Sequence, residues 1–302
     1  MNKLKGLFRR IHVNPIVKKD LRVISRSMKI AWGIFAYVAV LSVIFFLTVY
    51  FIFDMSSGYG YTNNYEEFVA LFPILAAVQF GIIGLIMPIL TATAVSGEKE
   101  KQTFDLLLTT VMSAGAIVRG KVTSAVIRMM VFIIASIPLM AISFTIGGLS
   151  WGYLFIVMIA FLIFAIYTGS VGIFASTLTK KSITAIILTY VFYFGISQIS
   201  FIPTIIVLIS SISGGGVNMI MGVMLLNPAI AVLEMFVLIF GEDLFSGNGW
   251  GLVSGWAWVI ISGIVTLMIS FLLQRLAAWR IDPLHGYIIR NKKKKSVTGV
   301  VK

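Results

Sequence analysis

The 302-residue sequence contains no cysteine and few charged residues. Without cysteine the chain can form no disulfide, no thiolate metal site and no thiol nucleophile. Charged residues make up 12% of the chain, whereas roughly 25% is typical of soluble domains. Hydrophobic residues make up 59% and the mean hydropathy is +1.02. These values indicate an integral membrane protein. Its only two histidines lie in the basic ends, so we expect no catalytic residue and no metal site.

Apolar stretches longer than the roughly 20 residues of a membrane-spanning helix recur along the chain. They are continuous rather than alternating, which favours helices over the strands of a barrel. We predict an all-α integral membrane protein with six transmembrane helices, at about 31–53, 69–95, 122–146, 151–177, 183–211 and 250–273. The predicted organisation is a cytoplasmic tail with an interfacial helix over 1–30, a transmembrane domain over 31–273 and a basic tail over 274–302.

The basic residues predict the orientation. All 24 Lys and Arg residues lie in the two ends, in 96–128 or in 179–182, and segments 54–68, 147–150 and 212–249 contain none. Since Lys and Arg stay on the cytoplasmic side, we place both termini there. Residues 182–233 are uncharged and could hold two spans, but a seventh span would put the basic tail outside. We therefore predict an outer re-entrant segment at about 213–249, with a seven-span chain as the alternative.

The segment 14–29, NPIVKKDLRVISRSMK, predicts an amphipathic helix on the membrane surface. Asn14 can cap this helix and Pro15 suits its first position. Apolar residues form one face, while Lys18, Arg22 and other basic residues form the opposite face. Such a helix lies on anionic membrane lipids. Topology and lipid contact thus account for the net charge of +13, and we expect no nucleic acid partner.

A second amphipathic segment, SGEKEKQTFDLLLTT, begins at Ser96 between the second and third predicted spans. We predict a cytoplasmic helix at about 96–113, whose apolar residues recur at helical spacing: Phe104, Leu107, Leu108 and Val111. Glu98 and Glu100 are expected in its first turn, where the helix dipole favours carboxylates. The polar face carries both signs of charge, which suits a protein partner. A solvated loop helix with internally paired charges is the alternative.

This segment resembles the signature of ABC-2-type permeases, the membrane subunits of one class of ATP-binding-cassette transporters. That signature runs approximately Gly-Glu-Lys/Arg-Glu-x-Gly/Gln-Thr, followed by a Leu-rich helix and a Gly-Lys pair that here is Gly120-Lys121. Val111 departs from it, because members often have proline there. The stretches NPIVKKDLR, from Asn14, and NPAIAVLEMF, from Asn227, also resemble the family, the first as its elbow helix. The coupling residues that the resemblance implies are Gly97, Glu98, Lys99, Glu100, Gln102, Thr103, Asp105 and Leu106.

The resemblance implies that the membrane pathway and ATP hydrolysis belong to separate chains. The 96–113 helix would be a coupling helix seated in a separate ATPase subunit, so this chain would be no enzyme. ATP and Mg²⁺ would bind in two such subunits, and this chain would bind no cofactor. A second permease copy or a homologue would complete the pathway, in a bacterial cell membrane and in the direction of export.

Two further sequence features bear on function: a near-match to a phosphate-binding loop and two glutamines within predicted spans. The stretch GAIVRGKV, 115–122, nearly fits a phosphate-binding loop, but valine stands where serine or threonine is required. Gln79 and Gln198 lie near the middles of two spans, where they either form interhelical hydrogen bonds or line a substrate path.

A membrane scaffold or sensor stays an alternative function. An ion-coupled carrier is the other, although no intramembrane pair of Asp, Glu or Lys supports it.

Overall fold

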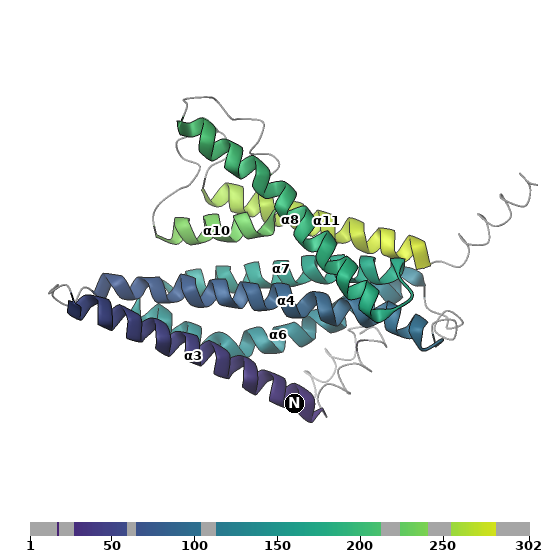
Figure 1. Ribbon diagram of the computed structural model, residues 1–302, viewed down its shortest axis with the longest axis horizontal. Helices are drawn as coiled ribbons and strands as arrows, with labels where there is room; N and C mark the ends of the chain where they lie inside the picture. Colours follow the sequence, from purple (N-terminus) through teal and green to yellow (C-terminus); the bar gives the residue numbers. More distant parts are fainter. Residues whose placement is uncertain are drawn as a thin grey trace, which may run out of the picture.

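The computed structural model describes residue 17 and residues 27–58, 65–103, 113–212, 224–240 and 255–281. These parts form helices and no strand, so the all-α prediction is confirmed for them (Figure 1). The elements are α3 (Met28–Gly58), η1 (Tyr65–Ala70), α4 (Leu71–Glu100), α6 (Ala114–Ile146), α7 (Trp151–Leu178), α8 (Ser182–Ile212), α10 (Pro228–Ile239) and α11 (Trp256–Ile281). Within the described residues, α3, α4, α6, α7 and α11 are the five helices long and apolar enough to cross a membrane.

The span predicted at 183–211 and the re-entrant segment stay predictions. The predicted span 183–211 coincides with α8, a single helix of 31 residues whose side chains are described mainly up to Ser197. In the predicted segment 213–249, residues 224–240 are described. They include α10, whose 12 residues extend about 18 Å, less than the about 30 Å of a bilayer core. This short helix lies against α11 and α7.

Several helix ends differ from the predicted ones. Helix α4 continues to Glu100 rather than ending near residue 95. Helix α6 begins at Ala114 instead of residue 122, after Ser113, whose hydroxyl accepts a hydrogen bond from the Ala116 amide. Helix α11 begins at Trp256 and continues to Ile281. Hydropathy marks where the apolar run stops, whereas a helix ends where capping groups satisfy its last backbone groups.

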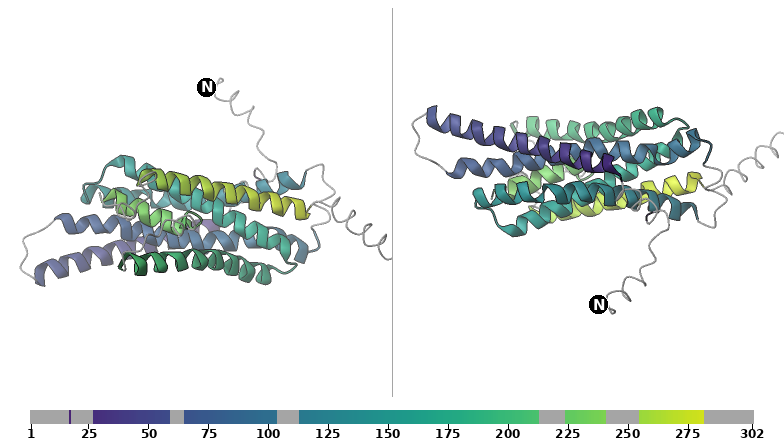
Figure 2. Two further views of the ribbon diagram at one scale, coloured as in Figure 1. Left: turned by 90° about the horizontal axis from the view of Figure 1, so that it is seen from above. Right: turned by 90° about the horizontal axis from the view of Figure 1, so that it is seen from below.

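Helix α7 is the centre of the bundle. It packs against α4, α6, α8 and α11, and the long helices run side by side in both views of Figure 2. The contact with α4 is close, because Gly169 and Gly172 of α7 face Met87 and Thr91 of α4 with no room for a further side chain. Small residues allow helix backbones to approach in this way within membranes. The glycines therefore set the spacing of the two most closely packed helices.

Candidate functional site: the charged end of the bundle

The charged end is the end of the bundle where α4 and α7 finish and where α6 and α8 begin. Signature residues Gly97–Glu100 form the last turn of α4. The expectation that Glu98 and Glu100 open a new helix is therefore wrong. They lie at a helix C-terminus, where the dipole disfavours carboxylates. Residues 104–112, which include Asp105 and Leu106, lie outside the described residues.

Helix α4 ends in a Schellman motif at Gln102. The amide of Thr103 donates to the carbonyl of Glu98 at 2.9 Å, and the amide of Gln102 donates to the carbonyl of Lys99 at 3.2 Å. Gln102 has a φ of 58°, in the left-handed region that this motif requires and that glycine adopts most readily. This conformation gives a physical reason for the glycine that the signature allows at this position. The side chains of Lys101, Gln102 and Thr103 are exposed.

Lys99 binds the end of α7. Its Nζ donates to the carbonyl of Thr177 at 2.6 Å and to that of Thr179 at 3.4 Å. Helix α7 ends at Leu178, so these carbonyls belong to a terminus that lacks intrahelical partners and carries the negative end of a helix dipole. A lysine there both satisfies the carbonyls and opposes the dipole, and Lys99 thus caps α7.

Glu100 binds the beginning of α8. Its Oε2 accepts hydrogen bonds from the Ser182 amide at 3.0 Å and from the Ser182 hydroxyl at 2.6 Å. Helix α8 begins at Ser182, so the carboxylate lies at the positive end of that helix. The interaction offsets the unfavourable position of Glu100 at the end of its own helix. Lys99 and Glu100 together hold both sides of the short turn between α7 and α8.

Glu98 binds a third helix, α6. Its Oε1 lies 2.5 Å from Nζ of Lys121, and the two side chains are 26% and 15% exposed. Both residues line a cavity of about 400 Å³, together with Lys101, Arg128 and Ser182. Within the described part of the chain, Oε2 of Glu98 and Nε of Arg128 are buried without a hydrogen-bond partner. The ion pair therefore lies in a mostly enclosed, basic environment.

Ser176 adds a contact that the sequence did not indicate. Its hydroxyl accepts hydrogen bonds from the amides of Val95, at 3.0 Å, and Ser96, at 2.8 Å, and so joins α4 to α7 one turn before Lys99. Ser182 was missed in the same way. Both residues are separated from their partners by about 80 positions, and no local pattern records such a pairing. They complete a site that joins α4 to three helices.

The other predicted residues fall in three places. Gln79 is buried, and the hydroxyl of Tyr37 donates to its Oε1, so an interhelical hydrogen bond from α3 to α4 is present. The path-lining role of Gln79 stays a prediction. Gln198 lies in α8, but its side chain is outside the described residues. The elbow residues Asn14, Pro15, Lys18 and Arg22 are outside them too.

The substitution Tyr37→Phe is expected to lower the free energy of unfolding by about 1–3 kcal/mol, because Gln79 then loses its hydrogen bond in a buried position. Thermal unfolding in detergent measures the change. Tyr50→Phe is the matched control on the exposed face of the same helix, and it should have no effect. The double variant Tyr37→Phe/Gln79→Leu should recover most of the loss. Unchanged stability combined with altered transport would instead favour a path-lining role.

The stretch 115–122, which resembles a phosphate-binding loop in sequence, is helical in the structure. Those residues form the first turns of α6, a continuous helix from Ala114, whereas a phosphate-binding loop wraps its backbone around the nucleotide. The stretch supplies Lys121 to the ion pair with Glu98 instead. Nucleotide binding at this position is therefore not supported by the fold.

Comparison with known proteins identifies the family. No curated protein sequence matches the chain significantly. A family model described as "ABC-2 family transporter protein" matches residues 14–273, a range that contains all the predicted spans and the charged end. The chain therefore belongs to the ABC-2 family of transporter proteins and is a multi-pass membrane permease.

Proposed function

We propose that this chain is the permease subunit of an ATP-driven exporter in the plasma membrane of a bacterium. Two copies, or one copy and a homologue, would enclose the pathway. Two separate ATPase subunits would bind ATP and Mg²⁺, while this chain binds no cofactor and catalyses no reaction. Membership of the family supports a permease with an ATP-binding-cassette partner in general. The direction, the host and the copy numbers rest on the resemblance.

The observation that carries the proposal is that Glu98, Lys99 and Glu100 each bind a different helix. They reach α6, the end of α7 and the beginning of α8, respectively. A displacement of the exposed turn that follows, and of residues 104–112 beyond it, would therefore move four helices together. Nucleotide-driven closure of an attached ATPase pair could bias such an assembly between inward-facing and outward-facing states.

The described basic residues support a cytoplasmic location for the charged end. Lys29 is at the beginning of α3 and Arg128 lies within α6. The other eight lie near the ends of α4, α7 and α11 and the beginnings of α6 and α8, and an excess of Lys and Arg is typical of cytoplasmic segments. These residues are Lys99, Lys101, Arg119, Lys121, Lys180, Lys181, Arg275 and Arg280. Helix α3 also begins at this end in Figure 1, and we infer that both termini are cytoplasmic. The basic tails would then contact anionic lipids of the inner leaflet.

The test is co-expression with the products of the neighbouring genes, followed by co-purification and measurement of ATP turnover in proteoliposomes. Lys101→Glu, on the exposed turn, is expected to weaken ATPase binding, because its side chain is free to meet a partner. Glu100→Lys is expected to leave the ATPase bound and to lower coupled turnover by about 5-fold or more, because it detaches α8. Thr145→Ala, exposed at the opposite end of α6, is the control.

Three outcomes would contradict the proposal. A failure of any ATPase with a phosphate-binding loop to co-purify would favour a scaffold or sensor. Substrate movement without ATP would favour an ion-coupled carrier. Full binding and full turnover in both charge-reversed variants would show that the charged end is not where the ATPase acts.

A further inference from the structure

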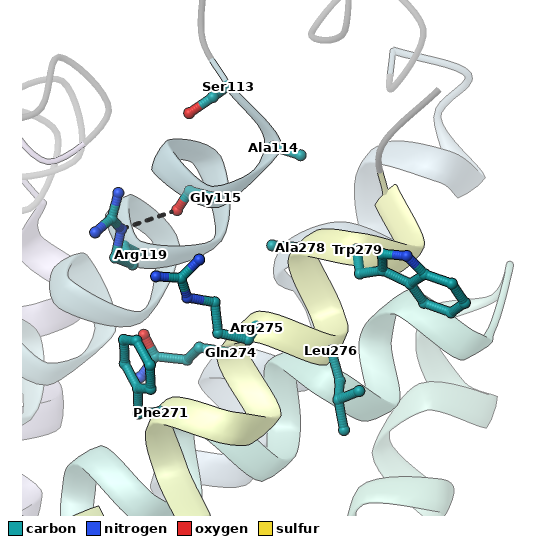
Figure 3. Close-up of a pocket in the computed structure, with 10 residues that line it drawn as sticks. All are labelled: Ser113, Ala114, Gly115, Arg119, Phe271, Gln274, Arg275, Leu276, Ala278 and Trp279. Atoms are coloured by element: carbon teal, nitrogen blue, oxygen red, sulfur yellow. Dashed lines mark hydrogen bonds between the residues drawn. The ribbon is translucent and has the colours of Figure 1, made fainter. Parts of the chain in front are cut away.

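A cavity of about 580 Å³ opens between the beginning of α6 and the last turns of α11 (Figure 3). Figure 3 shows the guanidinium groups of Arg119, from α6, and Arg275, from α11, beside each other in the space between the helices. The described residues that line the cavity include no acidic side chain. Two exposed arginines that line one cavity without an acidic side chain make its potential positive, which favours an anion.

The contacts of the two arginines leave both charges without a carboxylate partner. Nε of Arg119 donates to the carbonyl of Gly115 at 3.2 Å, one turn earlier in α6. The guanidinium carbon of Arg275 lies 5.0 Å from the centre of the Phe271 ring. Neither arginine forms a salt bridge within the part of the chain that the structure describes. Both are exposed and retain N–H donors that a ligand in the cavity can use.

The cavity borders an apolar groove on the surface of α11. This groove, of about 680 Å³, is lined by side chains between Ile264 and Leu272, and Phe271 lines both spaces. The groove extends about 10 Å along the helix toward the middle of the bundle. Trp279, at the opposite side of the cavity, is 54% exposed, and tryptophan is enriched at the level of lipid headgroups. A polar space thus borders an apolar one, in the order that the headgroup and acyl chain of an inner-leaflet lipid would require.

We propose that this site binds an anionic phospholipid, with its phosphate between Arg119 and Arg275 and one acyl chain in the groove along α11. Guanidinium groups bind phosphate through paired hydrogen bonds, and the beginning of α6 adds the positive end of a helix dipole. A soluble phosphate compound would occupy the cavity but leave the groove empty. The bound lipid would join α6 to α11 at the end of the bundle that carries the ion pair of Glu98.

The test uses the full-length protein in detergent, with phosphatidylglycerol, phosphatidylcholine and inorganic phosphate added separately. Native mass spectrometry and thermal unfolding report binding. Phosphatidylglycerol should bind and raise the unfolding temperature, and phosphatidylcholine should do so far less. Arg119→Gln/Arg275→Gln should weaken phosphatidylglycerol binding by at least about tenfold, because charge-assisted hydrogen bonds are lost. Arg280→Gln, exposed on the same helix and outside the cavity, is the matched control and should bind as the parent does.

The Arg119→Lys/Arg275→Lys variant keeps both charges and guards against a folding defect in the glutamine variant. It should show intermediate affinity, since lysine cannot form the bidentate contact. Equal phosphatidylglycerol binding by the parent and both double variants would overturn the proposal. An equal thermal shift with inorganic phosphate alone would assign the cavity to a soluble anion. A lipid-independent dimer that both double variants abolish would assign it to a second copy of this chain.

Discussion

The Gly172→Val variant is expected to lose more stability than any other single substitution in α7 that we consider. A Cβ atom at this position would overlap the hydroxyl of Thr91 and would lie 2.9 Å from the Thr91 Cβ and 3.3 Å from the Ala92 amide nitrogen. The last of these is backbone, so relief requires α4 and α7 to separate. Overpacking of this kind typically costs about 1–3 kcal/mol, and valine adds two further methyl groups. The unfolding temperature in detergent and the yield of monodisperse protein measure the loss.

Two other glycines provide graded controls for this prediction. At Gly169 an added Cβ would meet the terminal methyl of Met87, a flexible side chain that can turn away, so Gly169→Ala should cost less. At Gly81 of α4 no atom lies within 4 Å, and Gly81→Ala should be neutral or should stabilise by up to about 1 kcal/mol through helix propensity. The same stability for all three variants would contradict the close approach of α4 and α7.

A compensating change locates the source of the strain. Thr91→Ala removes the hydroxyl that an added Cβ at Gly172 would overlap, but it leaves the Ala92 amide in place. The double variant Gly172→Ala/Thr91→Ala should therefore recover part of the stability that Gly172→Ala loses. Thr91→Ala alone should have a small effect, because its hydroxyl bonds only to carbonyls of its own helix. Full recovery or none would show that another contact limits the spacing.

The membrane helices were predictable because the property that selects them is local. A run of about 20 apolar residues suffices to predict a span, and five of the predicted spans coincide with described helices that could cross a membrane. Some helix ends were less predictable, since the side chains that cap them come from distant segments. Glu100 and Ser182 illustrate this, because nothing near either residue indicates that one caps the helix that begins at the other.

The interpretation of the signature failed in an instructive way. Carboxylates do favour a helix N-terminus, and the helix predicted at about 96–113 puts Glu100 in its first turn. In the structure it lies at the end of α4 and satisfies the rule at the beginning of α8. Local sequence could indicate the kind of interaction but not which helix would take part in it. The family resemblance fared better, because it depends on the residues and not on an assumed helix boundary.

The second large effect is expected at the ion pair of Glu98 and Lys121. Glu98→Lys and Lys121→Glu should each lower coupled ATP turnover by about 5-fold or more, if the pair transmits motion from α4 to α6. The pair is mostly shielded from solvent, so its loss should also cost roughly 1–3 kcal/mol, between the values for exposed and fully buried pairs. ATP turnover of the reconstituted complex measures the first effect, and thermal unfolding measures the second.

Exchange of the two residues separates transmission from general damage. Glu98→Lys/Lys121→Glu restores opposite charges across the same gap, so turnover should recover well above that of either single variant. Recovery should be incomplete, because the exchanged lysine lies beside Lys99 and the original environment of each charge differs. Thr145→Ala, exposed at the opposite end of α6, should leave turnover unchanged. If the single variants fold and turn over ATP as the parent does, or if the exchange brings no recovery, α4 does not drive α6 through this ion pair.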